Sequence, residues 1–277
     1  MNTRILRLGP TSVRCADTGG GGPAVLLTHG IGESLEFWLP QLEALGSSMR
    51  LVAWDMPGHG ESDIPPAAMD LQGLARVGWQ LLEQLGIESA HLVGNSLGAA
   101  VSLRMAGQNA ARARSLLLAN SATLGSEVFP VFKVMTLPWL GEVMNKPSPK
   151  SAEMQIKAIV HRAQAITPQV HAAIERNTHR PGAAGHFLAT LRMLTTLRGQ
   201  KPATWQESHR LLRELKIPAL ILHGRQDGVL PTKHSEQAHA LAPGSELLIL
   251  DDCGHTPQLE QPEAFNAQLT ALVQRAG

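Results

Sequence analysis

The stretch Gly94-Asn95-Ser96-Leu97-Gly98 is the most informative part of this sequence for predicting its fold. It follows the apolar run His91–Val93, which predicts a strand, and precedes Ala99–Gln108, which predicts a helix. Between a strand and a helix, the pattern Gly-x-Ser-x-Gly predicts a turn so sharp that the serine hydroxyl projects above a sheet. Glycines suit the outer positions because side chains there would collide across the turn. We therefore expect Ser96 to be a nucleophile.

The composition limits the class of protein. The chain has 277 residues, of which 43% are hydrophobic, and this suits one large α/β domain or a domain with an insertion. With 17% charged residues and a net charge of +1, we expect neither nucleic acid nor a membrane surface as a partner. No apolar run approaches the ~18–20 residues of a membrane span, and no signal-peptide core is recognised. Cys15 and Cys253, far apart in the sequence, predict no disulfide framework and a cytoplasmic location.

Short apolar runs alternate with helical patterns along most of the chain. This alternation predicts an α/β fold with a mostly parallel sheet covered by helices on both faces. The first two runs, joined by Gly9-Pro10, predict an antiparallel edge. The expected strands are Ile5–Leu8, Ser12–Ala16, Ala24–Thr28, Arg50–Trp54, His91–Val93, Ser115–Ala119, Ala219–His223 and Glu246–Leu250. The expected helices include Trp38–Leu45, a helix capped by Asp70, Ala99–Gln108 and Pro262–Val273.

Residues 122–213 interrupt the alternation, and no β-rich run occurs there. Ser151–Ile166 and Gly185–Leu197 have helical apolar spacing, and Thr167-Pro168 is typical of a helix start. We therefore predict a helical insertion at 122–213, rather than an independent domain, within a core formed by residues 1–121 and 214–277. Met135 and Met193 in this insertion are candidate substrate contacts because methionine lines adaptable apolar pockets, although ordinary core packing explains them equally well.

A serine nucleophile needs a general base and an acid that fixes the tautomer of that base. The expected strand Ala219–His223 leads into a loop with Asp227, and Glu246–Leu250 leads into a loop with His255. Because the carboxyl ends of parallel strands meet at one edge of a sheet, we expect both side chains beside Ser96. We assign His255 as the base and Asp227 as the acid.

Three other aspartates are alternatives to Asp227. Asp251 and Asp252 lie only four and three residues before His255, so their loop would have to fold back sharply. Asp55 ends an earlier strand, and we interpret it as a cap for the turn that follows.

Two backbone N–H groups are candidates for binding an anionic oxygen. The N–H of Leu97 begins the helix after the turn, and the N–H of Ile31 lies in His29-Gly30-Ile31-Gly32, where glycines allow close approach. We expect the His29 ring to bond the local backbone and hold this loop. Glu33 follows the loop and is a candidate substrate contact, with a solvated loop residue as the alternative.

The 12 histidines call for a test of metal binding. None lies at the spacing of a zinc site, and the Gly19–Gly22 run lacks the Lys-Ser/Thr of a phosphate loop. We therefore expect neither a metal nor an organic cofactor.

Together these pieces resemble the α/β-hydrolase superfamily. The matching motifs occur in the family's order and are His29–Gly32, Asp55–Ser62, Gly94–Gly98, Gly224–Asp227 and Gly254-His255. The resemblance covers about residues 1–122 and 214–277. It implies an eight-stranded sheet, a helical cap inserted after the sixth strand, and Ser96, Asp227 and His255 as a catalytic triad. Ser96 argues against the dehalogenases and epoxide hydrolases of this superfamily, whose nucleophile is an aspartate.

Within the superfamily the chain is similar to carboxylesterases, enol-lactonases and meta-cleavage-product C–C hydrolases. The last group often carries an aromatic residue soon after the catalytic histidine, where this chain has Thr256–Glu260. We predict a cofactor-independent serine hydrolase that cleaves a small or medium ester or lactone through an acyl-enzyme on Ser96. The alternatives are C–C hydrolysis of a β-diketone-like compound and a non-catalytic protein that binds a small ligand in a retained pocket. The expected partner is a small-molecule substrate, and the expected state is a monomer or homodimer.

Overall fold

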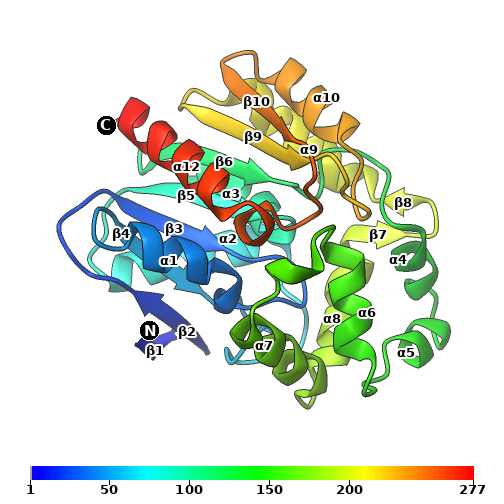
Figure 1. Ribbon diagram of the computed structural model, residues 1–277. Coiled ribbons are helices and arrows are strands. Elements are labelled where there is room, and N and C mark those ends of the chain that lie inside the picture. The colour runs from blue at the N-terminus through cyan, green and yellow to red at the C-terminus, as the bar shows by residue number, and fades with distance from the viewer. Residues whose placement is uncertain (1) are drawn as a thin grey trace.

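A computed structural model describes residues 2–277 of the chain (Figure 1). Its main sheet has eight strands in the order β1-β2-β4-β3-β5-β6-β9-β10. β2 runs antiparallel to β1 and β4, and the other neighbouring pairs are parallel, which confirms the predicted sheet and its antiparallel edge. The strands are β1 (Thr3–Leu8), β2 (Thr11–Asp17), β3 (Ala24–Thr28), β4 (Arg50–Trp54), β5 (Ala90–Asn95), β6 (Ala113–Ala119), β9 (Ala219–Gly224) and β10 (Ser245–Leu250).

Helices cover both faces of this sheet. α2, α3, α9 and α10 pack on one face, and α1 and α12 pack on the other. Alternate residues of β3 divide between the two layers, since Leu26 joins the first cluster while Val25 and Leu27 join the second. All three are completely buried, which explains the unbroken apolar run. The helices of these layers are α1 (Leu39–Leu45), α2 (Leu71–Gln84), α3 (Leu97–Gln108), α9 (Pro202–Glu214), α10 (Lys233–Leu241) and α12 (Pro262–Ala276).

Two predicted helix starts are confirmed by their capping bonds. The Asp70 carboxylate accepts a hydrogen bond from the Gly73 N–H at 2.6 Å, where α2 begins. The Thr167 hydroxyl accepts one from the Val170 N–H at 3.3 Å, and Pro168 is the first residue of the helix that follows. In both cases a side-chain oxygen satisfies an N–H that has no partner within the helix.

The chain between β6 and β9 forms a group of helices that lies beyond the carboxyl ends of the parallel strands (Figure 1). The predicted cap after the sixth strand is therefore present. Its elements are α4 (Pro130–Met135), α5 (Leu140–Met144), α6 (Ser151–Ile159), the 3₁₀ turn η2 (Ala163–Ala165), α7 (Pro168–His179) and α8 (Ala183–Leu194).

Three expectations for the insertion and its neighbours need correction. The helix expected at 151–166 ends at Ile159, because the backbone N–H groups of His161 and Arg162 bond to a carboxylate outside the helix. The helix expected at 185–197 ends at Leu194, where a short hairpin of β7 (Thr195–Thr196) and β8 (Gly199–Gln200) supplies the strands that the sequence did not predict. The helix expected from Trp38 is preceded by a 3₁₀ turn, η1 (Leu35–Trp38).

Helix α9 returns the chain to the sheet layer. The guanidinium of Arg104 on α3 donates to the Ser208 hydroxyl at 2.8 Å and to the Thr204 carbonyl at 2.7 Å, both on α9. The expected boundary of the cap at residue 213 thus falls inside a helix that packs on the core. Across residues 2–277, no helix is both long and apolar enough to pass through a lipid bilayer.

Candidate active site

Ser96 lies on the turn between β5 and α3. Its backbone has φ +54° and ψ −115°, a conformation that residues with side chains rarely adopt. A Cβ on Gly94 would lie 2.3 Å from the backbone of Gly98, and a Cβ on Gly98 would lie 2.0 Å from the carbonyl oxygen of Thr28. The turn therefore needs both glycines. At Gly94 the conflict lies across the turn, as the sequence suggested, whereas at Gly98 it lies with the end of β3.

His255 and Asp227 meet at the same edge of the sheet. His255 Nδ1 lies 2.8 Å from Asp227 Oδ2, and the two side chains are 3% and 0% exposed. Because a carboxylate only accepts, Nδ1 carries the hydrogen and Nε2 is left with a free lone pair. Burial acts to lower the pKa of His255, but the Asp227 carboxylate outweighs it and raises this pKa. Among the hydrogen bonds of residues 2–277, none joins the Ser96 hydroxyl to the His255 ring.

Asp227 is held by five donors. Oδ2 also faces Nδ2 of Asn120 at 2.7 Å and Nε2 of His223 at 3.1 Å. Oδ1 accepts the two backbone N–H groups of Val229-Leu230 at 2.7 and 3.1 Å. Burial acts to raise the pKa of Asp227, but the charge on His255 and the bonds from both histidines lower it strongly. This carboxylate is therefore fixed in orientation and stays ionised.

Asn120 and His223 were not identified from the sequence. Asn120 follows β6 directly, and His223 is the penultimate residue of β9, so both lie at the edge where Asp227 and Ser96 lie. A rule that collects every polar residue at the end of a predicted parallel strand would have found both.

The alternative acids lie elsewhere. Asp251 pairs with Arg225, and Asp252 pairs with Arg162 and with His161, all on the surface. Within residues 2–277, no hydrogen bond or ion pair joins either aspartate to His255.

The Gly30–Glu33 segment forms a tight turn beside Ser96. The N–H of Glu33 donates to the Gly30 carbonyl at 3.3 Å, and the N–H of Gly30 donates to Glu33 Oε2 at 2.7 Å. Gly32 has φ +74°, which glycine adopts without strain. The Ile31 N–H makes no hydrogen bond within residues 2–277, and the N–H of Leu97 begins α3, so both are free to donate to another acceptor.

His29 holds the start of this turn. Its Nε2 accepts a hydrogen bond from the Met56 N–H at 3.1 Å, so its Nδ1 carries the hydrogen and donates to the Gly30 carbonyl at 2.7 Å. The expectation that this ring bonds the local backbone is confirmed.

Glu33 is buried, with 2% of its surface exposed, so the alternative of a solvated loop residue is wrong. The turn folds its side chain inward onto the Gly30 N–H. Burial raises the pKa of this carboxyl to about 7, against a usual value of 4.5. Contact between Glu33 and substrate stays a prediction.

The cap places an apolar cluster against the Gly30–Glu33 turn. Met135, Leu188 and Leu191 form its buried centre, and Ile31 and Phe187 pack on it. A Cβ on Gly32 would lie 3.2 Å from the Phe187 ring. Met193, by contrast, packs against the main core cluster. Contacts of Met135 and Met193 with substrate stay predictions, and Phe187 is an aromatic neighbour that the sequence did not reveal.

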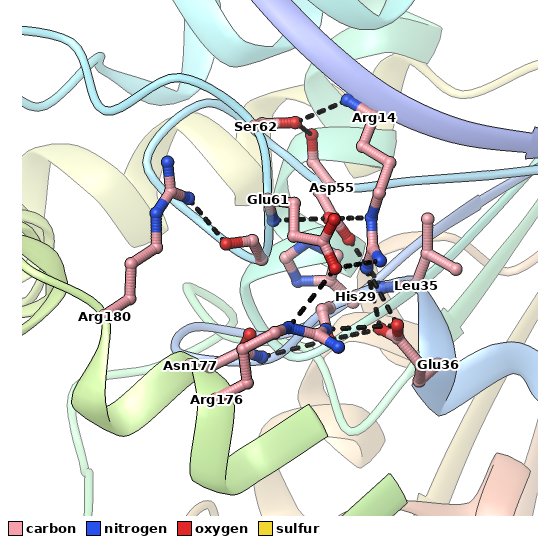
Figure 2. Close-up of polar contacts among 12 residues, drawn as sticks. Arg14, His29, Leu35, Glu36, Asp55, Glu61, Ser62, Arg176, Asn177 and Arg180 are labelled. Atoms are coloured by element: carbon pink, nitrogen blue, oxygen red, sulfur yellow. Dashed lines mark hydrogen bonds and ion pairs between the residues drawn. The ribbon is translucent and has the colours of Figure 1, made fainter. Parts of the chain in front are cut away.

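A second buried polar cluster lies where the middle of β2 passes the carboxyl end of β4 (Figure 2). Arg14 on β2 donates to Asp55 at 2.6 Å, to Glu36 at 2.9 Å and to Glu61 at 2.7 Å. Asp55 Oδ2 also accepts the Glu61 N–H at 2.8 Å, which closes the turn after β4 as expected. Burial acts to lower the pKa of Arg14, but Asp55 and Glu36 raise it above its usual value. Arg14 therefore keeps its proton.

This cluster also binds the cap. Figure 2 shows Arg176 and Asn177 of α7 (Pro168–His179), and Arg180 directly after it, reaching toward it. Arg176 lies 3.1 Å from Glu36. Asn177 donates to the Ser34 hydroxyl at 3.0 Å, and Arg180 donates to the Gly60 carbonyl oxygen at 2.5 Å. The cap is therefore anchored to the core through polar contacts, of which the Asn177 bond is buried and the two arginine contacts are partly buried.

The part of the chain that the structure describes, residues 2–277, contains no group of three or more His, Cys, Asp or Glu side chains placed to hold a metal ion. Cys15 and Cys253 are buried and unpaired.

Comparison with known proteins places this geometry in context. Residues 23–262 match the family described as alpha/beta hydrolase fold. An uncharacterized protein of Mycobacterium tuberculosis is 34% identical over 254 residues, covering 89% of this chain and 74% of its own. The 2-hydroxy-6-oxononadienedioate/2-hydroxy-6-oxononatrienedioate hydrolase of Comamonas testosteroni is 30% identical, covering 89% and 86%. A thermophilic esterase from Thermogutta terrifontis has a similar fold, with a TM-score of 0.80 at 24% identity, covering 100% of this chain and 99% of its own.

Proposed function

The chain belongs to the α/β-hydrolase family, and we propose that it is a serine hydrolase with Ser96 as nucleophile, His255 as base and Asp227 as acid. The observation that carries the proposal is the buried His255–Asp227 hydrogen bond of 2.8 Å, at the sheet edge where Ser96 has its strained backbone. A nucleophile, a base and a group that orients the base are the minimum set for acyl transfer.

The reaction proceeds in two halves. His255 Nε2 takes the Ser96 proton while Oγ attacks the carbonyl carbon of the substrate, and the N–H groups of Ile31 and Leu97 stabilise the oxyanion. The imidazolium then protonates the leaving oxygen, which leaves an acyl ester on Ser96. Water, deprotonated by His255, attacks this ester and releases the acid, and the proton returns to Ser96. Asp227 keeps Nδ1 protonated throughout and stabilises the imidazolium.

A small or medium ester or lactone with an apolar acyl part is the proposed substrate. The apolar cluster around Met135, Leu188 and Phe187 packs beside Ile31, whose N–H would bind the oxyanion. An acyl chain bound at that N–H would therefore extend toward apolar side chains, and such pockets select by fit.

C–C bond hydrolysis of a β-diketone-like compound is the second candidate. It is favoured by the Comamonas testosteroni relative, whose name describes hydrolysis of a 2-hydroxy-6-oxo compound. Measuring both a p-nitrophenyl ester series and a 2-hydroxy-6-oxodienoate on the same preparation separates the two candidates.

The test of the proposal is Ser96→Ala. We expect kcat to fall by at least ~10³-fold because only binding and oxyanion stabilisation remain. Stability should hardly change. A serine-directed phosphonate should add to Ser96 in the wild type, as peptide mass spectrometry would detect. A variant that keeps more than about a tenth of the wild-type rate would rule out the mechanism and favour a protein that only binds the ligand.

A further inference from the structure

Glu260 is a buried carboxylate, 5% exposed, at the end of α11 (Pro257–Glu260). Its Oε1 accepts hydrogen bonds from the N–H of Gly254 at 3.0 Å and the N–H of Thr256 at 3.3 Å. The Thr256 hydroxyl lies 3.3 Å from the same oxygen. The donors come from the two residues that flank His255, so this oxygen holds the histidine loop on both sides.

The other oxygen of Glu260 binds the cap. Oε2 accepts the backbone N–H groups of His161 at 2.7 Å and Arg162 at 2.9 Å, directly after α6 ends at Ile159. One carboxylate thus joins two segments that lie about a hundred residues apart. Both segments bond to it through backbone N–H groups, so the contact constrains the chain path itself.

The two segments also touch directly. The N–H of His255 donates to the carbonyl of Ile159 at 2.9 Å. A Cβ on Gly254 would lie 2.6 Å from the backbone nitrogen of His161, so glycine is needed for this close approach. On the other side of His255, its carbonyl accepts a hydrogen bond at 2.9 Å from Nδ2 of Asn95, the residue before Ser96. The His255 backbone is therefore fixed between the cap and the serine turn.

We propose that Glu260 is a positioning residue that couples the docked cap to His255. This inference rests on the proposed function, because the coupling acts by positioning His255, the proposed general base. The carboxylate holds the cap segment 159–162 and the loop 253–256 in one arrangement, so displacement of the cap moves the histidine. A shift of a catalytic group by about 1 Å can cost on the order of 10²-fold in rate. Coupling of this kind makes turnover depend on a closed cap.

The pKa of His255 depends on the carboxyl groups around it, and it therefore gives a readout of Glu260 that is separate from stability. Asp227 faces its ring from the loop after β9, Glu33 acts from the Gly30–Glu33 turn, and Glu260 acts from α11. Burial acts to lower the pKa of His255, and these three carboxyls together raise it. On the far side of Glu260 lie His161 and Arg162, which pair with Asp252, and behind Asp227 lies His223. Replacing Glu260 by a neutral residue therefore lowers the pKa of His255.

The decisive variant is Glu260→Gln. Glutamine has one acceptor oxygen and an NH₂ group, so one of the two segments would meet a donor in place of an acceptor. Glu263→Gln is the matched control, because it removes the same charge from an exposed position on α12. We expect kcat/KM of Glu260→Gln to fall ~10-fold or more, mainly in kcat, since hydrogen bonds to charged groups are lost. The acid limb of its pH profile should move to lower pH, while Glu263→Gln should match the wild type.

Hydrogen exchange tests the coupling without reference to activity. In Glu260→Gln, backbone exchange should accelerate in both segments, 159–162 and 253–256. Titration of His255 by NMR in a Ser96→Ala background should show a lower pKa when Glu260→Gln is added. A contact that only stabilises the fold would accelerate exchange without moving this pKa.

Other outcomes overturn the inference. If only one segment loosens, or if Glu260→Gln exchanges like Glu263→Gln, the two segments are not coupled through this carboxylate. If Ser96→Ala retains activity, the proposed function fails, while the exchange result still decides the coupling. Should Glu260→Gln not fold, Thr256→Val removes one donor from the same carboxylate, and we expect a smaller acceleration in both segments. No acceleration in that variant would count against the coupling.

Discussion

Two aspartates in this molecule have similar positions and different partners. Asp55 follows β4 and Asp227 follows β9, both at the carboxyl edge of the sheet, and both side chains are 0% exposed. Asp227 faces His255, whose imidazole can gain and release a proton, while Asp55 faces Arg14, which keeps its proton. A buried carboxylate at a strand end is therefore not enough to mark a reactive site. The partner's ability to release a proton makes the difference.

The largest expected effect separates the two aspartates by activity. Asp227→Asn should lower kcat by ~10³-fold or more, because the amide can bond Nδ1 in the wrong tautomer and cannot stabilise an imidazolium. The measurement is kcat and KM on an activated ester, with circular dichroism to verify folding. Binding should persist, so most of the loss should lie in kcat.

Asp251→Asn and Asp252→Asn are the matched controls, since both change a surface aspartate paired with arginine. We expect each to keep activity within a few-fold of the wild type, as surface ion pairs contribute only ~0–1 kcal/mol. A loss at either position as large as that at Asp227 would mean that the acid has been assigned to the wrong residue.

The second effect falls on stability. Arg14→Met should destabilise the fold by about 3–5 kcal/mol, because it leaves the Asp55 carboxylate buried without its cation and leaves Glu36 with Arg176 alone. The ring of His255 and its bond to Asp227 are untouched, so the fraction that remains folded should keep its turnover number. Urea unfolding and active-site titration with a phosphonate measure the two quantities on one sample.

Arg4→Met is the control for this change. Arg4 pairs with Asp17 on neighbouring strands, but its side chain is 51% exposed and Arg50 also binds Asp17. Its loss should cost about 0–1 kcal/mol. Equal destabilisation by the two variants would show that burial of the Arg14 cluster is not what matters.

The sequence predicted those parts of the site that depend on local pattern. Ser96, Asp227 and His255 each follow a short apolar strand, so the strand alternation predicted that their loops lie at one edge, while their catalytic roles stay predictions. The same reasoning gave the glycine turn, because its steric conflict is confined to the residues around Ser96 and the neighbouring β3.

The remainder depends on contacts between distant segments. Nothing near Glu260 in the sequence reveals that it bonds His161 and Arg162, and α6 ends early because those N–H groups have an acceptor outside the helix. Likewise Arg14 finds Asp55 through strand pairing across 41 residues. Such partners follow from sheet register and cap docking, which a pattern of residue types does not determine.

Glu33 provides the smallest and most discriminating test, because it is a buried carboxyl to which, within residues 2–277, no basic side chain is bonded. Its folded pKa, raised by burial to about 7, lies above its usual 4.5. The folded state therefore binds a proton that the unfolded chain has lost, and the stability this gives is present below about pH 4.5 and is lost as pH rises through about 7.

Glu33→Gln keeps an oxygen for the Gly30 N–H but does not titrate. The wild type should lose stability relative to Glu33→Gln as the pH rises. The difference between their free energies of unfolding should shift in favour of the variant by about 1–3 kcal/mol from pH 5 to pH 8, since each unit of pKa shift corresponds to about 1.4 kcal/mol. Urea unfolding across that range, with Glu263→Gln beside it, measures the difference. If the two curves run parallel to that of the wild type, Glu33 carries its charge at neutral pH, as Asp227 does, without a basic side chain bonded to it.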